Sequence, residues 1–522
     1  MSLPKTPFHE AQSRRTLWRG GHVLSPTSPD ATAMLVEGAT ITWVGPDAEA
    51  PVADQTVDLD RALVTPAFVD SHVHLTGTGE SLTGLHLSGL GSAGAVLDQV
   101  AEYARTLPPA AVVLAGGWDE TAWDDPTLPA PEAVERAAGG RLVYLSRACG
   151  HVGIAGPRVL ADHPELRALD RVSDTGVLTR AAHRAARGRL RAAVPVDQRL
   201  ATARTALDRA ASLGIAALVE HTVPVAADPH TEAEFTGLIA LGSHPGNPAV
   251  YGWWGELCAA EKARDLGAHG CGGDLSVDGS LGARTAFLRN PYRDDDSSRG
   301  ARYLTAEQIR DHLAACHRTG LSAAFHAIGD GAIATVLDGL DLAERSIGLD
   351  AIRHARHRLE HAELLDSELT ARMVHHGVHA SVQPAFDAAW GGAGGMYAAR
   401  LGPSAALAAN PFASLAGVGV PLSFGSDAPV TPLDPWGGVR AAVHHHNPGM
   451  RLTPATAFTA ATRGGWRALG IDDSGALAPG MRANFAVWDL TVPGLPDLGD
   501  PQAPAPQCLM TVAEGHHIHQ HA

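Results

Sequence analysis

The chain has 522 residues, of which 45% are hydrophobic and 18% are charged. This apolar content can fill a large core and excludes a globally disordered protein. Lys and Arg number 40 against 56 Asp and Glu, which gives a formal net charge of −16. A chain this acidic is a poor general ligand for nucleic acid or for an anionic membrane surface, so we expect neither as a partner and predict a small-molecule substrate instead.

The cysteines and the N-terminal residues bear on the cellular compartment. The cysteines are odd in number, scattered and without a Cys-x-x-Cys pair; they are Cys149, Cys258, Cys271, Cys316 and Cys508. This pattern argues against a disulfide framework and against a thiolate zinc site. The first residues are basic but lack the apolar segment of a secretory signal, and no run approaches the roughly 20 apolar residues of a membrane helix. We therefore expect a cytoplasmic protein.

The expected secondary structure changes character twice along the chain. Residues 16–62 are predicted to form short strands separated by glycine and proline turns, as in AMLVEGATITWVG. Apolar segments then alternate with helical stretches rich in Ala and Leu, and strand character returns in MRANFAVWDL and CLMTVAEGHHI. We expect residues 1–62 and 474–522 to form one small β-sandwich domain, and residues 63–473 to form the main domain.

The main domain is predicted to be an α/β barrel. A repeated strand-then-helix order indicates a parallel sheet, and about eight repeats indicate a (β/α)8, TIM-like barrel. Several of the helical stretches end in Gly, the usual residue after a helix C-terminus. The expected barrel strands are ALVTPAFVDSHVH, AVVLAGG, RLVYLSRA, GIAALVEH, LSAAFHAIG, HRLEHA, GVHASVQ and VPLSFGSDA.

Four histidines and one aspartate stand at the ends of these strands. His72 and His74 are two residues apart, so on a strand their side chains share a face and can converge on one metal ion. His326, His361 and Asp427 end three later strands. A single histidine of this kind is usually a buried structural imidazole, but the joint pattern predicts a divalent metal site. Nitrogen and oxygen donors suit Zn²⁺, with Fe, Mn or Ni as alternatives.

Together these motifs resemble the amidohydrolase superfamily of metal-dependent hydrolases, and within it the branch that contains N-substituted formamide deformylase. The resemblance covers residues 16–515 and is carried by VTPAFVDSHVHL, GGWDETAW, VDGSLGARTAFL, HAIGD, HRLEHAEL, GSDAPVTPLDPW and SGALAPGMRANFAVWDL. It implies a distorted barrel with a composite β-sandwich and one or two metal ions. It also implies hydrolysis of a non-peptide C–N bond in an N-acyl amine, an amide or a cyclic amide.

The sequence departs from this family where a carboxylated lysine often bridges two metal ions. Asp274 occupies that position, four residues before the Asp278-Gly-Ser segment, and an aspartate can ligate metal directly. Glu220, at the end of GIAALVEH, is a second candidate because some superfamily members use a glutamate from an earlier strand. A mononuclear site is the third alternative. His221, next to Glu220, is expected to be structural.

The expected mechanism combines the metal with two of the strand-end residues. A divalent metal lowers the pKa of bound water from about 15.7 toward roughly 7 and thereby supplies hydroxide at neutral pH. Asp427 is expected to accept the proton of this water and later to protonate the leaving nitrogen. The metal or His326 is expected to polarise the scissile carbonyl.

Three further residues are predicted to contact the substrate. Trp118, near Trp123, resembles part of a lid segment in the family branch, where an aromatic wall would hold an apolar amine group; ordinary loop packing is the alternative. His151 ends another strand and resembles a histidine that would hydrogen-bond the developing oxyanion. Arg284 can anchor a polar substrate group or can hold its own loop by a salt bridge.

Two other functions are compatible with the same fold. One is a heterocycle deaminase that uses the same site, and the other is a non-catalytic assembly protein. The five strand-end residues favour an enzyme, because an assembly protein would need none of them. No glycine-rich phosphate loop occurs in the sequence, so no nucleotide cofactor is expected. A homodimer is the commonest assembly of soluble enzymes.

Overall fold

The computed structural model describes residues 14–120, 123–147, 152–168, 176–224, 228–501 and 503–521. The chain folds into two compact units. The first comprises Met1–Leu75, Leu207–Val223 and Leu238–Ala522, and the second comprises Thr76–Ala206 and Pro224–Gly237. His151, one of the predicted substrate contacts, lies outside the described residues. Each unit has sheets of its own and is described by itself.

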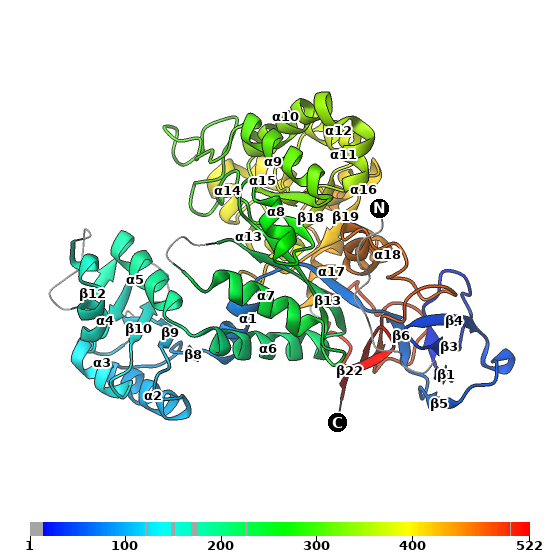
Figure 1. The fold of residues 1–522 in the computed structure, drawn as a ribbon, viewed down its shortest axis with the longest axis horizontal. Coiled ribbons are helices and arrows are strands. Elements are labelled where there is room, and N and C mark those ends of the chain that lie inside the picture. Colours follow the sequence, from blue (N-terminus) through cyan, green and yellow to red (C-terminus); the bar gives the residue numbers. More distant parts are fainter. Residues whose placement is uncertain are drawn as a thin grey trace. The chain divides into compact units, whose positions relative to one another are not determined.

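An eight-stranded parallel sheet forms the centre of the first unit (Figure 1). The residues after its last strand meet the end of its first strand: the Asp427 N–H donates to the His72 carbonyl at 2.7 Å, and the His74 N–H donates to the Ala428 carbonyl at 2.9 Å. The predicted TIM-like barrel is therefore confirmed. In chain order, its strands are β7 (Phe68–Val73), β13 (Ile215–Thr222), β14 (Ala249–Trp254), β15 (Gly270–Cys271), β16 (Ser322–Ala327), β17 (Arg358–His361), β18 (His379–Val382) and β19 (Leu422–Phe424).

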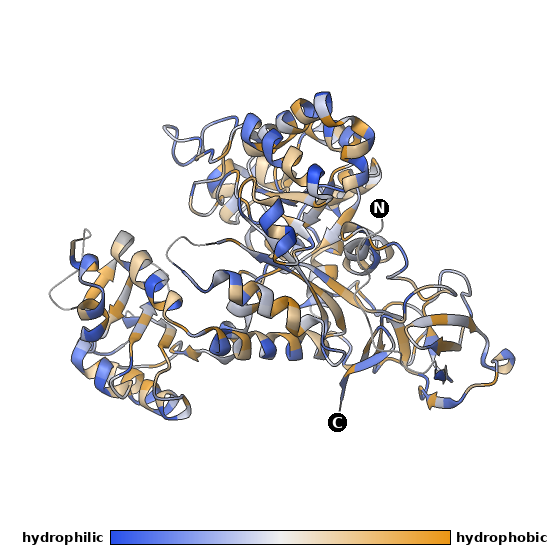
Figure 2. Ribbon diagram, viewed as in Figure 1, coloured by the Kyte–Doolittle hydropathy of each residue, from blue (hydrophilic) through white to orange (hydrophobic). Residues whose placement is uncertain are grey.

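The barrel strands are apolar because both of their faces are buried. Every residue of β7, β17 and β18 is buried. In such a barrel, helices cover the outside of the sheet and side chains from the strands fill the inside. Figure 2 shows this arrangement, with hydrophobic colours along the central strands and hydrophilic colours on many of the peripheral helices.

Helix α9 of the first unit begins and ends at residues that favour caps. In α9 (Ala306–Thr319), the Thr305 and Gln308 side chains accept hydrogen bonds from each other's backbone N–H groups. Gly320 follows at φ 75°, a left-handed conformation that suits glycine. No helix within the described ranges is both long and apolar enough to cross a membrane. The other helices are α8 (Ala260–Asp265), α10 (Asp330–Ile347), α11 (Leu349–Ala355), α12 (Ser367–His376), α13 (Pro384–Trp390), α14 (Met396–Leu401), α15 (Pro403–Ala408), α16 (Phe412–Gly417), α17 (Pro435–Val443), α18 (Pro454–Thr459) and α19 (Gly465–Ala468).

Two of the predicted barrel strands belong to another sheet, so the prediction for them was wrong. AVVLAGG and RLVYLSRA form β9 (Val113–Trp118) and β10 (Val143–Arg147) in the second unit, whose strand order is β12–β11–β10–β9–β8. These two strands are parallel and have helix α3 (Pro131–Ala137) between them, so they look like barrel strands in the sequence. The barrel uses β14 and β15 instead, and the two residues of β15 are too few to leave an apolar run.

The second unit surrounds its sheet with helices. Apolar residues of α2 and α3, such as Val96, Val100 and Val134, form a buried cluster with Val113 and Val143 of the sheet. Helices α1, α6 and α7 each have residues in both units. The remaining elements are α1 (Leu75–Thr83), β8 (Leu85–His86), α2 (Ala93–Thr106), β11 (Val152–Ala155), α4 (Pro157–Asp162), β12 (Val177–Thr179), α5 (Arg180–Ala192), α6 (Val196–Ser212) and α7 (Thr231–Gly242).

The two ends of the chain share a small β-sandwich in the first unit. One sheet has the order β4–β3–β1–β5, and the other has the order β2–β6–β20–β21–β22. C-terminal β20 pairs antiparallel with N-terminal β6, and Figure 1 shows the blue and red strands side by side. The strands are β1 (Arg15–Arg19), β2 (His22–Val23), β3 (Ala33–Glu37), β4 (Thr40–Gly45), β5 (Gln55–Asp58), β6 (Leu63–Pro66), β20 (Phe485–Trp488), β21 (Cys508–Ala513) and β22 (His516–Gln520).

The shared core of this sandwich can be tested with Phe485→Ala. Phe485 is fully buried among N-terminal residues such as Trp18 and Met34. Loss of its ring should lower the free energy of unfolding by about 3–5 kcal/mol, measured by urea denaturation. Val492→Ala is the control, since Val492 is 45% exposed and its truncation should change stability by less than about 0.5 kcal/mol. Equal effects of the two substitutions would contradict a core shared by both ends.

Candidate metal centre

The predicted metal ligands His72, His74 and Asp427 meet at the carboxyl ends of β7 and β19. Asp427 Oδ1 is 3.2 Å from His74 Nε2 and 3.5 Å from His72 Nε2. The strand alternation explains the pair of histidines, because residues two apart on β7 face the same side. The backbone of Asp427 is held next to the two histidines, because its N–H donates to the His72 carbonyl.

Asp274 lies against all four of the predicted histidines. Its Oδ2 is 3.1 Å from His74 Nε2, and its Oδ1 is 3.4 Å from His72 Nε2. The same Oδ1 is 3.7 Å from His326 Nδ1 and 3.8 Å from His361 Nε2. One carboxylate therefore stands between the His72–His74 pair and the His326–His361 pair, where a ligand can reach two ions.

Two glycines bring Asp274 into this position. Gly272 and Gly273 directly follow β15 and have φ values of 120° and 77°, which other residues rarely adopt. A Cβ atom on Gly273 would lie 2.1 Å from His221 Nδ1. The Gly-Gly-Asp sequence thus permits the close approach that places the carboxylate at the mouth of the barrel.

The imidazoles of His72 and His74 are oriented by hydrogen bonds that point away from the centre. His72 Nδ1 donates to a Glu360 carboxylate oxygen at 2.9 Å, and His74 Nδ1 donates to the His221 carbonyl at 3.0 Å. Carboxylate and carbonyl oxygens only accept, so both Nδ1 atoms carry protons. The lone pairs of both neutral rings are then on the Nε2 atoms, which face Asp274 and Asp427.

The other two imidazoles follow the same rule. His361 Nδ1 donates to Gln383 Oε1 at 2.8 Å, which leaves the lone pair on Nε2. His326 Nε2 donates to the Gly279 carbonyl at 3.3 Å, which leaves the lone pair on Nδ1. In both rings the nitrogen with the lone pair is the one that faces Asp274. Histidines that ligate a metal show this pattern, since the outer hydrogen bond sets the tautomer.

The inward atoms fit a divalent cation. His72 Nε2, Asp274 Oδ1 and Asp427 Oδ1 are buried and have no hydrogen-bond partner. Ligands at about 2.0–2.1 Å from a tetrahedral zinc ion are about 3.3 Å from one another. The separations of 3.1–3.8 Å from Asp274 to the imidazoles bracket this value. A cation would satisfy all of these acceptors at once.

The charges at the centre favour ionised carboxylates. Burial raises the pKa of Asp274, but the surrounding imidazoles, His72 first, bring it well below its usual range. Burial lowers the pKa of His72, whereas Asp274 and Asp427 raise it, to about 10. The two carboxylates thus favour positive charge beside His72, and a bound divalent cation would supply it.

A buried ion pair behind His72 escaped the sequence prediction. Arg358 Nε donates to Glu360 Oε1 at 2.9 Å, and Arg358 also donates to the Ser71 carbonyl at 2.7 Å. The side chains of Arg358 and Glu360 are fully buried. They stand two residues apart on β17 and share its inner face. The available sequence pattern was a pair of oppositely charged residues at this spacing in the expected strand HRLEHA.

The two candidate carboxylates, Asp274 and Glu220, have different partners in the structure. Glu220 Oε2 accepts from the Leu75 N–H at 2.7 Å, and Oε1 accepts from the Thr222 hydroxyl at 2.8 Å. Among the described residues, the groups able to hold a metal include Asp274 with His72 but do not include Glu220. His221 stacks on His72 with ring centroids 4.0 Å apart, and burial lowers its pKa well below the usual range. His221 thus packs against the ring of His72 and helps to hold it in place.

Two of the predicted substrate contacts have structural partners. Trp118 is 1% exposed in the core of the second unit, where its indole N–H donates to the Leu145 carbonyl at 3.2 Å. Arg284 lies in the first unit and makes hydrogen bonds of 2.8 and 3.1 Å to the Asp294 carboxylate. Both placements match the packing and salt-bridge alternatives, so substrate contact by either residue stays a prediction.

Comparisons with known proteins agree with this geometry. Residues 55–519 match the model of the Amidohydrolase family. The putative amidohydrolase YtcJ of Bacillus subtilis is 28% identical over 476 residues, which cover 82% of this chain and 83% of the relative. An imidazolonepropionase from Cereibacter sphaeroides is 28% identical over 469 residues, which cover 89% of this chain and 90% of the relative. A solved structure of an uncharacterized metal-dependent hydrolase from Pyrococcus furiosus matches with a TM-score of 0.76 and 24% identity, over 94% of this chain and 100% of the other.

The chain belongs to the amidohydrolase family. It is an enzyme, a hydrolase that acts on carbon–nitrogen bonds other than peptide bonds. Membership implies a divalent metal ion and a small-molecule substrate.

The role of Glu360 can be tested by Glu360→Gln. This change keeps the size of the side chain but removes the charge that orients His72 and neutralises Arg358. Metal affinity, measured by competition with a chelator, should fall about 10–100-fold. The free energy of unfolding should also fall by about 3–5 kcal/mol, because Arg358 is left buried and unpaired. Glu368→Gln on α12, whose side chain is 63% exposed, should alter neither quantity; unchanged metal affinity in Glu360→Gln would refute the orienting role.

Proposed function

We propose that this hydrolase cleaves an N-acyl amine, an amide or a cyclic amide by attack of water at a centre of one or two zinc ions. The observation that carries the proposal is the convergence of four imidazoles around the Asp274 and Asp427 carboxylates, each with its lone pair turned inward. This arrangement favours a catalytic protein over an assembly protein on the same fold, because an assembly protein has no use for a buried set of acceptors.

The proposed ligands fall into two groups that share Asp274. His72, His74 and Asp427 would hold one ion, and His326 with His361 would hold the other. Nitrogen and carboxylate donors without a thiolate suit Zn²⁺. When bound, the cation supplies Lewis acidity and lowers the pKa of water toward neutrality.

Asp427 is the proposed general base. Burial raises the pKa of its carboxyl group, but the neighbouring imidazoles, His72 first, bring the pKa below its ordinary value. The carboxylate is therefore ionised at neutral pH and can take a proton from the attacking water. Its backbone has a left-handed φ of 52° and is fixed by the hydrogen bond to the His72 carbonyl. The carboxyl group that has taken up this proton can then protonate the leaving nitrogen.

His326 is proposed to polarise the scissile carbonyl. Its side chain is 16% exposed, compared with 3% for His361 and 0% for His72, so a substrate can reach its ring. Burial lowers its pKa, but Asp274 more than offsets this and the pKa is raised. Its Nε2–H, which donates to the Gly279 carbonyl over 3.3 Å, is the group that would turn to the substrate oxygen as negative charge develops there.

The substrate class rests on the relatives and on the sequence motifs. One relative is named imidazolonepropionase, and an imidazolone ring contains a cyclic amide. The motifs around Trp118 and Arg284 resemble the branch of N-substituted formamide deformylase, which favours an N-acylated amine with an apolar group. A heterocycle deaminase is the second candidate, since the same centre can deliver water to a ring carbon that bears an amino group.

We further propose a homodimeric, cytoplasmic enzyme in which residues 1–62 and 474–522 form one domain and residues 63–473 form the other. The cysteines Cys258, Cys271, Cys316 and Cys508 are free thiols, which suits a reducing compartment.

Asp427→Asn tests the general base. The amide keeps the shape of the side chain but cannot accept the proton, so turnover should be lost while the zinc content remains. The assay uses whichever substrate the wild type hydrolyses in a panel of formamides, N-acyl amines, hydantoins and aminated purines. Zinc content is measured on the same samples by atomic emission. Turnover at the wild-type rate would rule out this role for Asp427.

The number of zinc ions tests the role of Asp274. The wild type should bind two equivalents at this centre, and Asp274→Ala should bind one or none, because the shared ligand is lost. Glu220→Gln is the matched control: it alters the other candidate carboxylate and should leave the count unchanged. A count that falls in Glu220→Gln but not in Asp274→Ala would reverse the assignment.

A further inference from the structure

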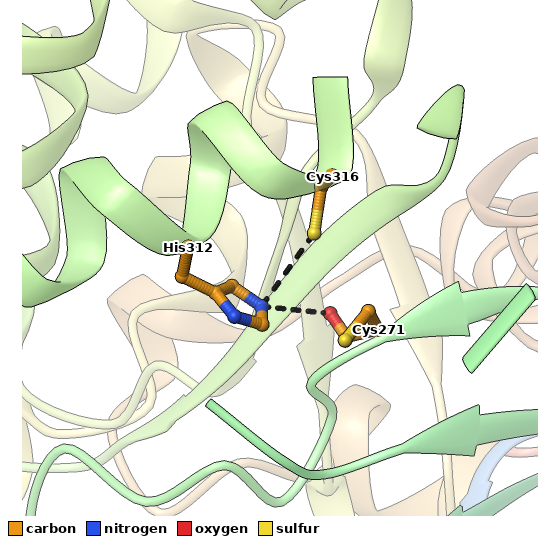
Figure 3. A group of neighbouring side chains, drawn as sticks. All are labelled: Cys271, His312 and Cys316. Carbon is orange, nitrogen blue, oxygen red and sulfur yellow. Dashed lines mark hydrogen bonds between the residues drawn. The ribbon is translucent and has the colours of Figure 1, made fainter. Parts of the chain in front are cut away.

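Within the part of the first unit that the structure describes, two clusters of potential ligands lie outside the proposed catalytic centre, and the hydrogen bonds of their histidines distinguish them. Figure 3 shows the first, formed by Cys271 of β15 with His312 and Cys316 of α9. The Cys258 backbone N–H donates to His312 Nδ1 at 2.9 Å, so the proton of the neutral ring is on Nε2. That Nε2 faces the Cys271 carbonyl at 3.2 Å and the Cys316 sulfur at 3.6 Å. A protonated Nε2 has no lone pair for a metal, so this cluster is a hydrogen-bonded part of the core.

The second cluster lies between the C-terminal ends of α10 and α12, which pack beside each other (Figure 1). It comprises Glu344 of α10 and the neighbouring residues His375 and His376 of α12. His376 Nε2 donates to a carboxylate oxygen of Asp341 at 2.8 Å. The proton of this ring is therefore on Nε2, and the lone pair is on Nδ1.

The His376 Nδ1 atom lacks a partner although it is buried. The side chain of His376 is 0% exposed, and Nδ1 has no hydrogen bond. The facing atom is Glu344 Oε2 at 3.7 Å, which is also an acceptor. Two acceptors that face each other without a proton between them are the environment that a cation satisfies.

We propose that Glu344, His375 and His376 form a binding site for a transition metal cation such as Zn²⁺, Ni²⁺ or Cu²⁺. The ligand atoms are His376 Nδ1, Glu344 Oε2 and His375 Nε2, and all lie within 4.8 Å of one another. In the metal-free protein His375 Nε2 donates to Glu344 Oε2 at 2.9 Å; because no backbone N–H fixes the tautomer of this exposed ring, its proton can move to Nδ1 and a cation can take its place on Nε2. Two imidazoles and one carboxylate favour these metals over Mg²⁺ or Ca²⁺, which prefer oxygen ligands. His375 is 49% exposed, so water can complete the coordination.

Neighbouring residues hold the proposed ligands in place. Asp341 sets the tautomer of His376, as carboxylates do behind metal-binding histidines. Arg372 donates to the other oxygen of Asp341 at 2.6 Å, so its positive charge is already paired. Arg353 Nε donates to the His375 carbonyl at 2.8 Å, which fixes the last turn of α12.

The position of this site indicates a stabilising role. Helices α10 and α12 follow β16 and β17 and run back along the barrel, so their C-terminal ends lie at the face opposite the catalytic centre. A cation held there would tie two neighbouring helices together without contact with the reacting groups. A ligand that binds only the folded state raises the melting temperature, by an amount that grows with the logarithm of its concentration divided by Kd.

Zinc titrations of the full chain test the site. Wild type, His375→Gln, Glu344→Gln and a control, His317→Gln, are titrated with Zn²⁺ in competition with a chromophoric chelator. His317 is an exposed histidine at the end of α9, outside the cluster. Wild type and the control should bind one more equivalent than the other two variants, whose affinity at this site should fall at least tenfold. The catalytic centre and the histidines of the C-terminal strand are unchanged in all four proteins, so they cancel in the comparison.

A second variant separates a built site from chance binding by surface histidines. Asp341→Asn leaves all three ligands in place but weakens the group that sets the His376 tautomer, so zinc affinity at the site should fall about 10–100-fold. Added Zn²⁺ should raise the melting temperature of the wild type and of His317→Gln more than that of Asp341→Asn, His375→Gln or Glu344→Gln. Equal zinc counts in all proteins, loss of the extra equivalent in His317→Gln, or binding only at millimolar zinc as an adventitious ion would overturn the proposal.

Discussion

The candidate metal centre depends on hydrogen bonds that point away from it. Glu360, Gln383 and two backbone carbonyls each accept a hydrogen bond from one side of an imidazole, so the opposite nitrogen presents a lone pair to the interior. The Asp274 and Asp427 carboxylates add further acceptors. Such a set of buried acceptors repels itself unless protons or a cation lie among them. The orientation of the rings therefore selects a metal site more strongly than the presence of histidines does.

The hydrogen-bond network continues behind the imidazoles. Glu360 orients His72 only because Arg358 balances its charge in the barrel interior, and Arg358 is held in turn over the Trp253 ring at 5.0 Å from its centroid. A charged pair at this depth is weak evidence for stability by itself. Its value here is positional: it gives one imidazole a single orientation and a single tautomer. The candidate metal centre and the core of the barrel are thus one connected network.

The parallel barrel explains why residues far apart in the chain meet at one place. Each strand delivers its last residues to the same mouth of the barrel, and the last of these strand ends is bonded to the first through His72 and Asp427. Asp274 enters from the shortest strand, where two glycines let the backbone pass close to His221. His361 and Asp427 have left-handed backbones, with φ values of 71° and 52°. Backbone conformations of this kind cost about 1–3 kcal/mol and are retained where the surrounding structure imposes them.

The sequence alone determined the barrel, the pairing of the chain ends and the five strand-end residues, because apolar periodicity marks strands and their last residues share one edge of a parallel sheet. It placed β9 and β10 in the barrel incorrectly, since a parallel strand beside a helix has the same pattern in any sheet. Only the tertiary structure decided that Asp274 rather than Glu220 faces the histidines and that Arg358 and Glu360 lie behind them. Closure of the sheet sets the distances between residues hundreds of positions apart, and spacing along the chain carries no information about those distances.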